Sequence, residues 1–130
     1  MPVPTQATYS VAALAAAHTT FRDLLDAGSA GASIKIRDAS DVLLAQIPLT
    51  DPCGTVNPTT GQLTLTPAGR DESADAAGLA AYGELCDSDG LVHLSLPAVA
   101  GTAPVAGCVV LNTLTVAGGS PVEILSATIG

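Results

Sequence analysis

The chain has 130 residues and a formal net charge of −8 at pH 7, because twelve Asp and Glu residues outnumber four Lys and Arg residues. This balance argues against nucleic acid and anionic membrane surfaces as partners, since both are bound through clustered basic side chains. The length predicts a single domain. No run of about 20 apolar residues occurs in the sequence, so we expect no membrane-spanning segment.

Composition also constrains the core. Hydrophobic residues make up 48% of the chain but aromatic residues only 2%, namely Tyr9, Phe21 and Tyr82. The interior must therefore consist of Val, Ile, Leu and Ala, which bury less area per side chain than aromatic residues do. We expect an isolated domain of modest stability, which association with a partner would increase.

The three cysteines, Cys53, Cys86 and Cys108, are odd in number and far apart. Without a Cys-x-x-Cys pair, this pattern favours small buried thiols over a disulfide framework. The apolar stretch at residues 11–17 follows no basic residue, so it lacks the pattern of a secretion signal. We therefore expect a protein made in a reducing cytoplasm.

The first residues of the chain predict an arm. Residues 1–9 contain Pro2 and Pro4 and show no hydrophobic periodicity. Such a segment is typical of an extended terminus, which can also drape over a neighbouring molecule. The rest of the chain, residues 10–130, is expected to form one domain.

That domain begins with a helix over residues 10–27. Ser10 is a suitable N-cap, and Gly28 can adopt the positive φ that ends many helices. Apolar side chains and one histidine recur at steps of three and four and so share one stripe; they are Val11, Leu14, His18, Phe21 and Leu25. Arg22 and Asp26 have the spacing of an ion pair. We expect His18 to be partly buried and hydrogen-bonded rather than a metal ligand.

After the helix the hydrophobic period changes to two, which predicts strands. The expected strands cover residues 32–37, 42–49, 62–66, 79–86, 91–96, 105–116 and 121–129. Loops are expected at residues 51–61, 67–78 and 97–104, and hairpin turns at residues 87–90 and 117–120. The fold class that follows is mostly β: an antiparallel sandwich or jelly-roll-like fold of about seven strands with one N-terminal helix.

The sequence contains no motif typical of catalysis or of a bound cofactor. His93 lies between Val92 and Leu94 in an expected strand and is interpreted as outward and solvated. Neither a phosphate-binding loop nor a nucleophile elbow is present. Asp87 and Asp89 resemble the start of a calcium loop, but the twelfth position is Ala98 rather than an acid. We therefore expect that the protein is not an enzyme and that it binds neither a cofactor nor a metal.

Two surface features leave alternatives open. The acidic loop around Asp71, Glu72 and Asp75 is either solvated or supplies oxygens to a cation. Thr64 and Thr66 point outward from an expected strand and belong to a set of hydroxyl side chains on outward faces. Such a set suits a wide, shallow contact with another protein, and it equally reflects the ordinary preference of Thr for strands.

Four segments carry a family resemblance. Residues 26–31 form a Gly/Ser/Ala link after the helix, and residues 32–38 form a strand that ends in an aspartate. Residues 73–80 read Ser-Ala-Asp-Ala-Ala-Gly-Leu-Ala and lead to a strand and an Asp-Gly turn. Residues 111–124 close the chain with Leu-Asn-Thr-Leu-Thr-Val-Ala-Gly-Gly-Ser-Pro-Val-Glu-Ile. From about residue 9 to residue 129, the chain resembles small virion proteins of tailed bacteriophages.

The resemblance implies a structural role without catalysis. The favoured role is a capsid decoration, or cement, protein that binds the major capsid protein on the outside of the virion, bridges neighbouring subunits and is itself a homo-oligomer, with a trimer favoured. A neck or tail ring is the alternative within a virion, and a surface ligand- or receptor-binding module is the alternative of another class. The protein would be made in the bacterial host cytoplasm.

Six residues are the candidates for contact with a partner: Pro2, Val3, Pro4, Thr64, Thr66 and Tyr82. The strand that carries Tyr82 departs from the pattern of the related proteins. They have a bulky aromatic residue followed by an arginine, whereas this chain reads Tyr82-Gly83-Glu84. The charge that this strand would present is therefore reversed.

Overall fold

The computed structural model describes residues 7–28 and 31–130. Its helix, α1 (Val11–Asp26), confirms the predicted one. The Ser10 hydroxyl oxygen accepts a hydrogen bond from the Ala13 N–H at 3.1 Å, as an N-cap does. At the other end the chain leaves the helix through Ala27 and Gly28, and Gly28 has φ +119°. The contact candidates Pro2, Val3 and Pro4 lie outside the described residues.

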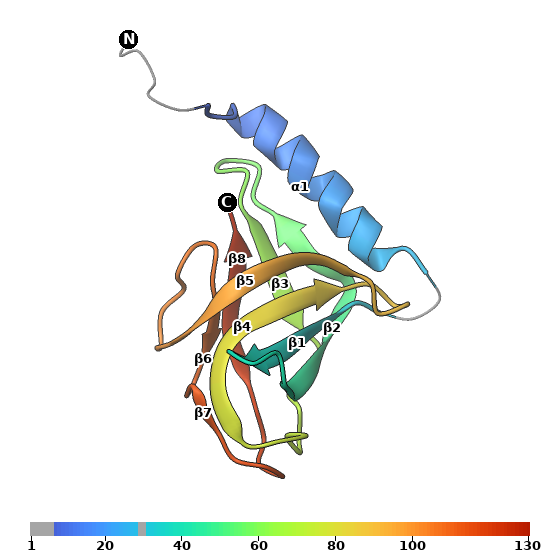
Figure 1. Cartoon of the computed structure of the whole chain (residues 1–130). Coiled ribbons are helices and arrows are strands. Elements are labelled where there is room, and N and C mark those ends of the chain that lie inside the picture. The colour runs from blue at the N-terminus through green and yellow to red at the C-terminus, as the bar shows by residue number, and fades with distance from the viewer. Residues whose placement is uncertain (1–6, 29–30) are drawn as a thin grey trace.

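The rest of the described chain is mostly β. The strands are β1 (Ser33–Asp38), β2 (Leu43–Val56), β3 (Leu63–Pro67), β4 (Gly78–Cys86), β5 (Val92–Ala100), β6 (Val109–Leu111), β7 (Thr115–Val116) and β8 (Ile124–Ile129). Neighbouring strands follow the order β1-β2-β3-β8-β6-β5-β4, and β1 also pairs with β4. That last pairing closes the sheet, so seven strands form a barrel and β7 is attached outside the ring to β4 (Figure 1).

The closed barrel corrects the expected antiparallel sandwich. β1 has both edges paired, with β2 on one side and β4 on the other, whereas a sandwich would leave sheet edges open. The sheet is also mixed, because β5 and β6 run parallel. The connection between β5 and β6 is long enough to let the chain return in the same direction, which a tight hairpin does not allow.

β2 is longer than predicted and includes part of the expected loop at residues 51–61. It pairs with β1 up to Pro48 and with β3 from Leu49 onward, so Pro48 marks a change of neighbour rather than the end of the strand. The register shifts between Leu49 and Gly54. This irregular stretch accommodates Pro52, which has no N–H to donate to a ladder.

The predicted strand at residues 105–116 is interrupted. Only β6 in its middle and β7 at its end are strands, and the Thr115 N–H at the start of β7 donates to the Thr113 hydroxyl oxygen at 3.2 Å. Local bonds of this kind compete with a strand ladder. β7 pairs with β4 and not with β8, so the turn at residues 117–120 is not a hairpin as predicted. The Asp87–Gly90 turn does join an antiparallel pair, β4 and β5, as predicted.

The core is aliphatic, as the composition implies. Its fully buried members come from five strands of the barrel and from α1; they include Leu25, Ile34, Ile36, Leu44, Ile47, Leu63, Leu85, Val109 and Leu111. Gly83 faces this interior, where an added Cβ would lie 3.2 Å from Ile34 Cγ2. A narrow barrel filled by branched side chains therefore has space only for a glycine at this point.

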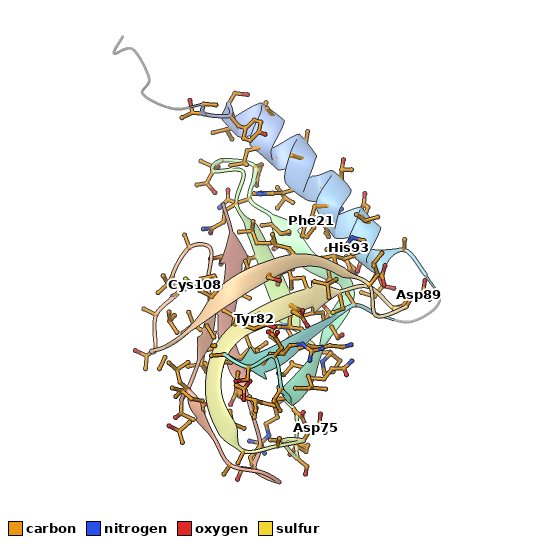
Figure 2. The ribbon with its side chains drawn as sticks, in the orientation of Figure 1. Phe21, Asp75, Tyr82, Asp89, His93 and Cys108 are labelled. Atoms are coloured by element: carbon orange, nitrogen blue, oxygen red, sulfur yellow. The ribbon has the colours of Figure 1, made fainter. Side chains whose placement is uncertain are left out.

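α1 lies across the outside of the barrel against β2 and β3 (Figure 1). Leu25 is fully buried, and Phe21 points from the helix toward the core (Figure 2). Val11, predicted on the same stripe, is instead largely exposed, because the first turn extends past the barrel. Within the described residues, no helix has the length and apolar character needed to cross a membrane.

Candidate functional site

Thr64 and Thr66 lie where the sequence predicts them. Both are exposed on β3, where they alternate with the buried side chains of Leu63 and Leu65. Thr64 pairs with residues on both neighbouring strands, Thr55 of β2 and Thr128 of β8. The β3 threonines are therefore held on a rigid wall of the barrel and face outward.

Tyr82 is tied to its own chain. It lies on β4, and its hydroxyl donates a hydrogen bond to Asp41 Oδ1 at 2.5 Å. This bond is the main reason that the pKa of Tyr82 rises to about 12, since the carboxylate favours the protonated phenol. Arg37 pairs with Glu84 and also donates to the Asp41 carbonyl oxygen at 3.0 Å. Glu84 thus has an intramolecular partner.

The predicted contact residues do not form one surface. β3 and β4 are separated by β1 and β2 in one direction around the ring and by β8, β6 and β5 in the other. Thr64 and Thr66 therefore lie on a different wall from Tyr82, which Figure 2 shows on the strand that crosses the front of the barrel. A single flat partner can contact one of the two walls.

His93 differs from its prediction as an outward, solvated side chain. Its side chain is 15% exposed, and its Nε2 lies 2.9 Å from Oδ2 of Asp87, whose side chain is 13% exposed. The hydrogen bond from His93 is the main cause that lowers the pKa of Asp87. Asp87 Oδ1 accepts from the N–H groups of Asp89 and Leu91, each at 3.0 Å. The pair therefore fixes the turn between β4 and β5.

Backbone N–H groups already bind carboxylate oxygens of the acidic loop. Asp71 Oδ2 accepts from the Gln46 N–H at 2.9 Å, and its Oδ1 accepts from the Ser73 N–H at 3.0 Å. Glu72 forms an ion pair with Arg70 at 3.1 Å. Among the described residues, no three His, Cys, Asp or Glu side chains converge as metal ligands would. These carboxylates are arranged to support the loop.

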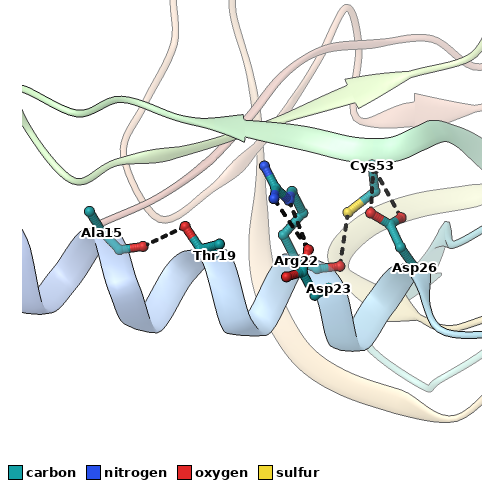
Figure 3. A network of polar contacts seen from close by, with 6 residues as sticks. All are labelled: Ala15, Thr19, Arg22, Asp23, Asp26 and Cys53. Carbon is teal, nitrogen blue, oxygen red and sulfur yellow. Dashed lines mark hydrogen bonds and ion pairs between the residues drawn. The ribbon is translucent and has the colours of Figure 1, made fainter.

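The polar contacts of α1 attach the helix to the barrel (Figure 3). Asp26 accepts from the Cys53 N–H through both carboxylate oxygens, at 3.0 and 3.1 Å. Arg22, predicted to pair with Asp26, instead pairs with Asp23 at 3.2 Å, because Asp26 is engaged with β2. His18 is buried as predicted, with its Nδ1 2.6 Å from the Gly61 carbonyl oxygen.

The cysteines are free, as predicted, and two of them are buried. Burial raises the pKa of Cys53 to about 12, and the nearby Asp26 carboxylate adds to the effect. Burial also raises the pKa of Cys86. Cys108 lies just before β6 and is half-buried. The two buried thiols therefore act as small apolar core groups rather than as nucleophiles.

The outer face of α1 was not predicted from the sequence. On the side away from the barrel the helix exposes mainly small or apolar side chains, Ala13, Ala16, Ala17, Thr20 and Leu24, together with one exposed carboxylate, that of Asp23, which pairs with Arg22. The exposure of Tyr9, which precedes the N-cap and is 77% exposed, was not predicted either. A signal was present, since the helix has few charged residues opposite its apolar stripe, where a solvated helix normally has many.

No family model, no curated protein and no solved structure matches the chain. The function must therefore be argued from the side chains described above.

Proposed function

We propose that the protein is a non-enzymatic structural component of a tailed-bacteriophage particle, where it decorates the outer shell and bridges neighbouring capsid subunits. The observation that carries this proposal is the outer face of α1. The helix is attached to the barrel along one side only, and its other side presents to the outside a strip of small and apolar side chains in which Asp23 is the exposed charged residue.

The dimensions of this strip suit a repeated contact. A helix of 16 residues is about 24 Å long at 1.5 Å per residue. A strip of that length and at most about 10 Å wide covers only about 240 Å², which is less than the about 800 Å² per partner that a stable one-to-one complex buries. An oligomer of this chain that places several such strips on the symmetric shell would nevertheless bind persistently, because the first bound strip raises the local concentration of the strips linked to it.

The net charge supports a partner that carries basic residues. The chain has a net charge of −8, and the outer strip of α1 is apolar apart from the exposed carboxylate of Asp23. A shell surface with an apolar groove and basic residues around it would complement both features. Electrostatic attraction would then speed association, and the strip would supply the close packing.

The first test is the copy number of this chain relative to the major shell protein in purified particles. If the chain occupies a position in the shell lattice, we expect one copy of it for each shell subunit, or one copy for a small whole number of shell subunits. A few copies per particle would instead indicate a neck or tail ring. Absence from particles would reject the virion proposal and favour a free binding module.

The second test places a charge on the strip. Ala16→Glu changes an outward position at little cost to helix formation, about 0.4 kcal/mol. We expect it to weaken binding of the recombinant protein to particles stripped of it by at least about tenfold. Ala103→Glu, which adds the same charge to an exposed loop, is the matched control and should bind normally. Equal binding of the two variants would exclude α1 as the contact.

A further inference from the structure

A pocket of ≈ 360 Å³ lies on the outer face of β1. Ser33 and Lys35 of β1 line it, together with Gln46 of β2 and the turn that joins β4 to β5. The residues on either side of Lys35 belong to the buried core, so Lys35 itself points away from the interior. The pocket therefore opens to the outside and is separate from the core of the barrel.

Lys35 differs from the other basic residues of the chain in its charge partners. Arg22, Arg37 and Arg70 each form an ion pair with a carboxylate, whereas Lys35 forms none with any described residue. Its Nζ lies at the turn, 3.9 Å from the position that a Cβ on Gly90 would occupy. Although acidic residues outnumber basic ones by twelve to four, this ammonium is left available to a ligand.

The carboxylates around Lys35 have partners of their own. Glu84, which is opposite Lys35 in the β1–β4 pair, is held by an arginine of β1. Asp87 lines the pocket, but one of its oxygens accepts two backbone N–H groups and the other lies 2.9 Å from His93 Nε2. Asp89, the other acidic residue of the turn, is exposed and does not line the pocket. The positive charge of Lys35 is therefore not neutralised by an ion pair within the chain.

The uncharged polar groups of the pocket are mainly hydrogen-bond donors. Gln46 Nε2 donates to Ser33 Oγ at 3.2 Å, so the hydroxyl proton of Ser33 and the second amide proton of Gln46 can be donated to a ligand. Ser88 Oγ is buried and has no hydrogen-bond partner among the described residues. A polar group left in this way lowers stability, and rotation about the Cα–Cβ bond can turn the hydroxyl toward a bound group. These donors and the Lys35 ammonium suit an anion.

We infer that this pocket binds a monocarboxylate with a short aliphatic body. One ammonium balances one negative charge, and a dianion would be repelled by the net charge of −8. The aliphatic body would contact the apolar residues that also line the pocket, namely Ala32, Pro48 and Leu49. The carboxylate can belong to a free acid or to a glutamate side chain of another protein. The inference concerns the purified protein and does not depend on the virion proposal.

The test is a titration of the isotope-labelled full chain with butyrate, followed through the amide NMR signals of Ser33, Gln46 and Gly90. Butyramide has the same shape without the charge, and inorganic phosphate tests for a general anion site. Lys35→Gln removes the ammonium from the pocket. Arg70→Gln changes the net charge equally at a residue outside the pocket and is the matched control. Circular dichroism verifies that both variants are folded.

We expect saturable shifts with butyrate and a dissociation constant of about 1–10 mM, since so small a ligand makes few contacts. Lys35→Gln should weaken binding at least about tenfold, and Arg70→Gln should bind normally. Tighter binding of a glutamate blocked at both backbone ends would assign the carboxylate to a partner protein, and tighter binding of butyrate to a free acid. Shifts that do not saturate, equal binding of butyramide, tighter binding of phosphate, or equal affinities of the two variants would each overturn the inference.

Discussion

The attachment of α1 to the barrel can be tested by truncating the side chain that anchors it. Leu25 is 0% exposed and belongs to the barrel core, whereas the adjacent Leu24 is 48% exposed on the same helical turn. Leu25→Ala removes three buried carbon atoms, worth about 0.8 kcal/mol each, and leaves a cavity that raises the total cost to about 3–4 kcal/mol. Leu24→Ala has the same chemistry and should change stability by less than about 0.5 kcal/mol.

Urea unfolding followed by far-ultraviolet circular dichroism measures both variants. Because most domains of this length unfold in one cooperative transition, the loss should appear as a lower midpoint with an unchanged slope. A cost below about 1 kcal/mol for Leu25→Ala would refute the reasoning. It would mean that α1 rests on the barrel without being part of its core.

Three further predictions concern the barrel itself. Gly54→Ala should destabilise by about 3 kcal/mol in urea unfolding, because the added Cβ would overlap the Thr64 carbonyl oxygen; Gly69→Ala, with open space around it, is the control and should be nearly neutral. Because the pKa of Asp87 is lowered from 3.8 in the folded protein, its ionised carboxylate stabilises the fold at pH values above 3.8, and this stabilisation is lost as the pH falls through the lower pKa of the folded state. Asp87→Asn should therefore reduce stability at neutral pH and have no effect in strong acid. A difference in stability that does not change with pH would contradict this. In the native protein, a thiol reagent at mildly alkaline pH should modify Cys108 and spare the two buried thiols. Cys108→Ser should therefore abolish the reaction, and continued modification of this variant would show that the core opens and exposes the buried thiols.

Local features of the fold could be predicted because they depend on neighbouring residues. The N-cap Ser10, the positive φ of Gly28 and the turn that ends in Gly90 each follow from a side chain or a missing Cβ in the turn itself. The alternation of Leu63, Thr64 and Leu65 likewise gives the burial of β3 directly. These elements are confirmed by the structure.

The closure of the barrel could not be predicted from such patterns. A strand in a barrel and a strand in a sandwich show the same alternation, because both bury one face. The difference depends on pairings between distant segments, such as Ser33 with Cys86 and Gly78 with Val116. The same limit explains why the turn at residues 117–120 was wrongly read as a hairpin.

The candidate site shows this limit more strongly. The outward threonines of β3 follow from their own strand, but the partner of Tyr82 is Asp41, on a loop 41 residues away. Tyr9 and the outer face of α1 were visible in the sequence, but their importance depends on knowing which side of the helix is covered.

The proposed contact of α1 with the shell can be separated from the attachment of α1 to the barrel. Ala16 lies on the outer strip, so Ala16→Glu should weaken shell binding and leave the midpoint of urea unfolding nearly unchanged. Leu24 lies on the same strip and is 48% exposed, so Leu24→Ala should likewise act on binding more than on stability. Leu25→Ala should lower both, because it loosens the attachment that holds the strip in place. If Leu25→Ala lost stability but bound the shell normally, the strip would not be the contact, because binding would then be independent of how α1 is held.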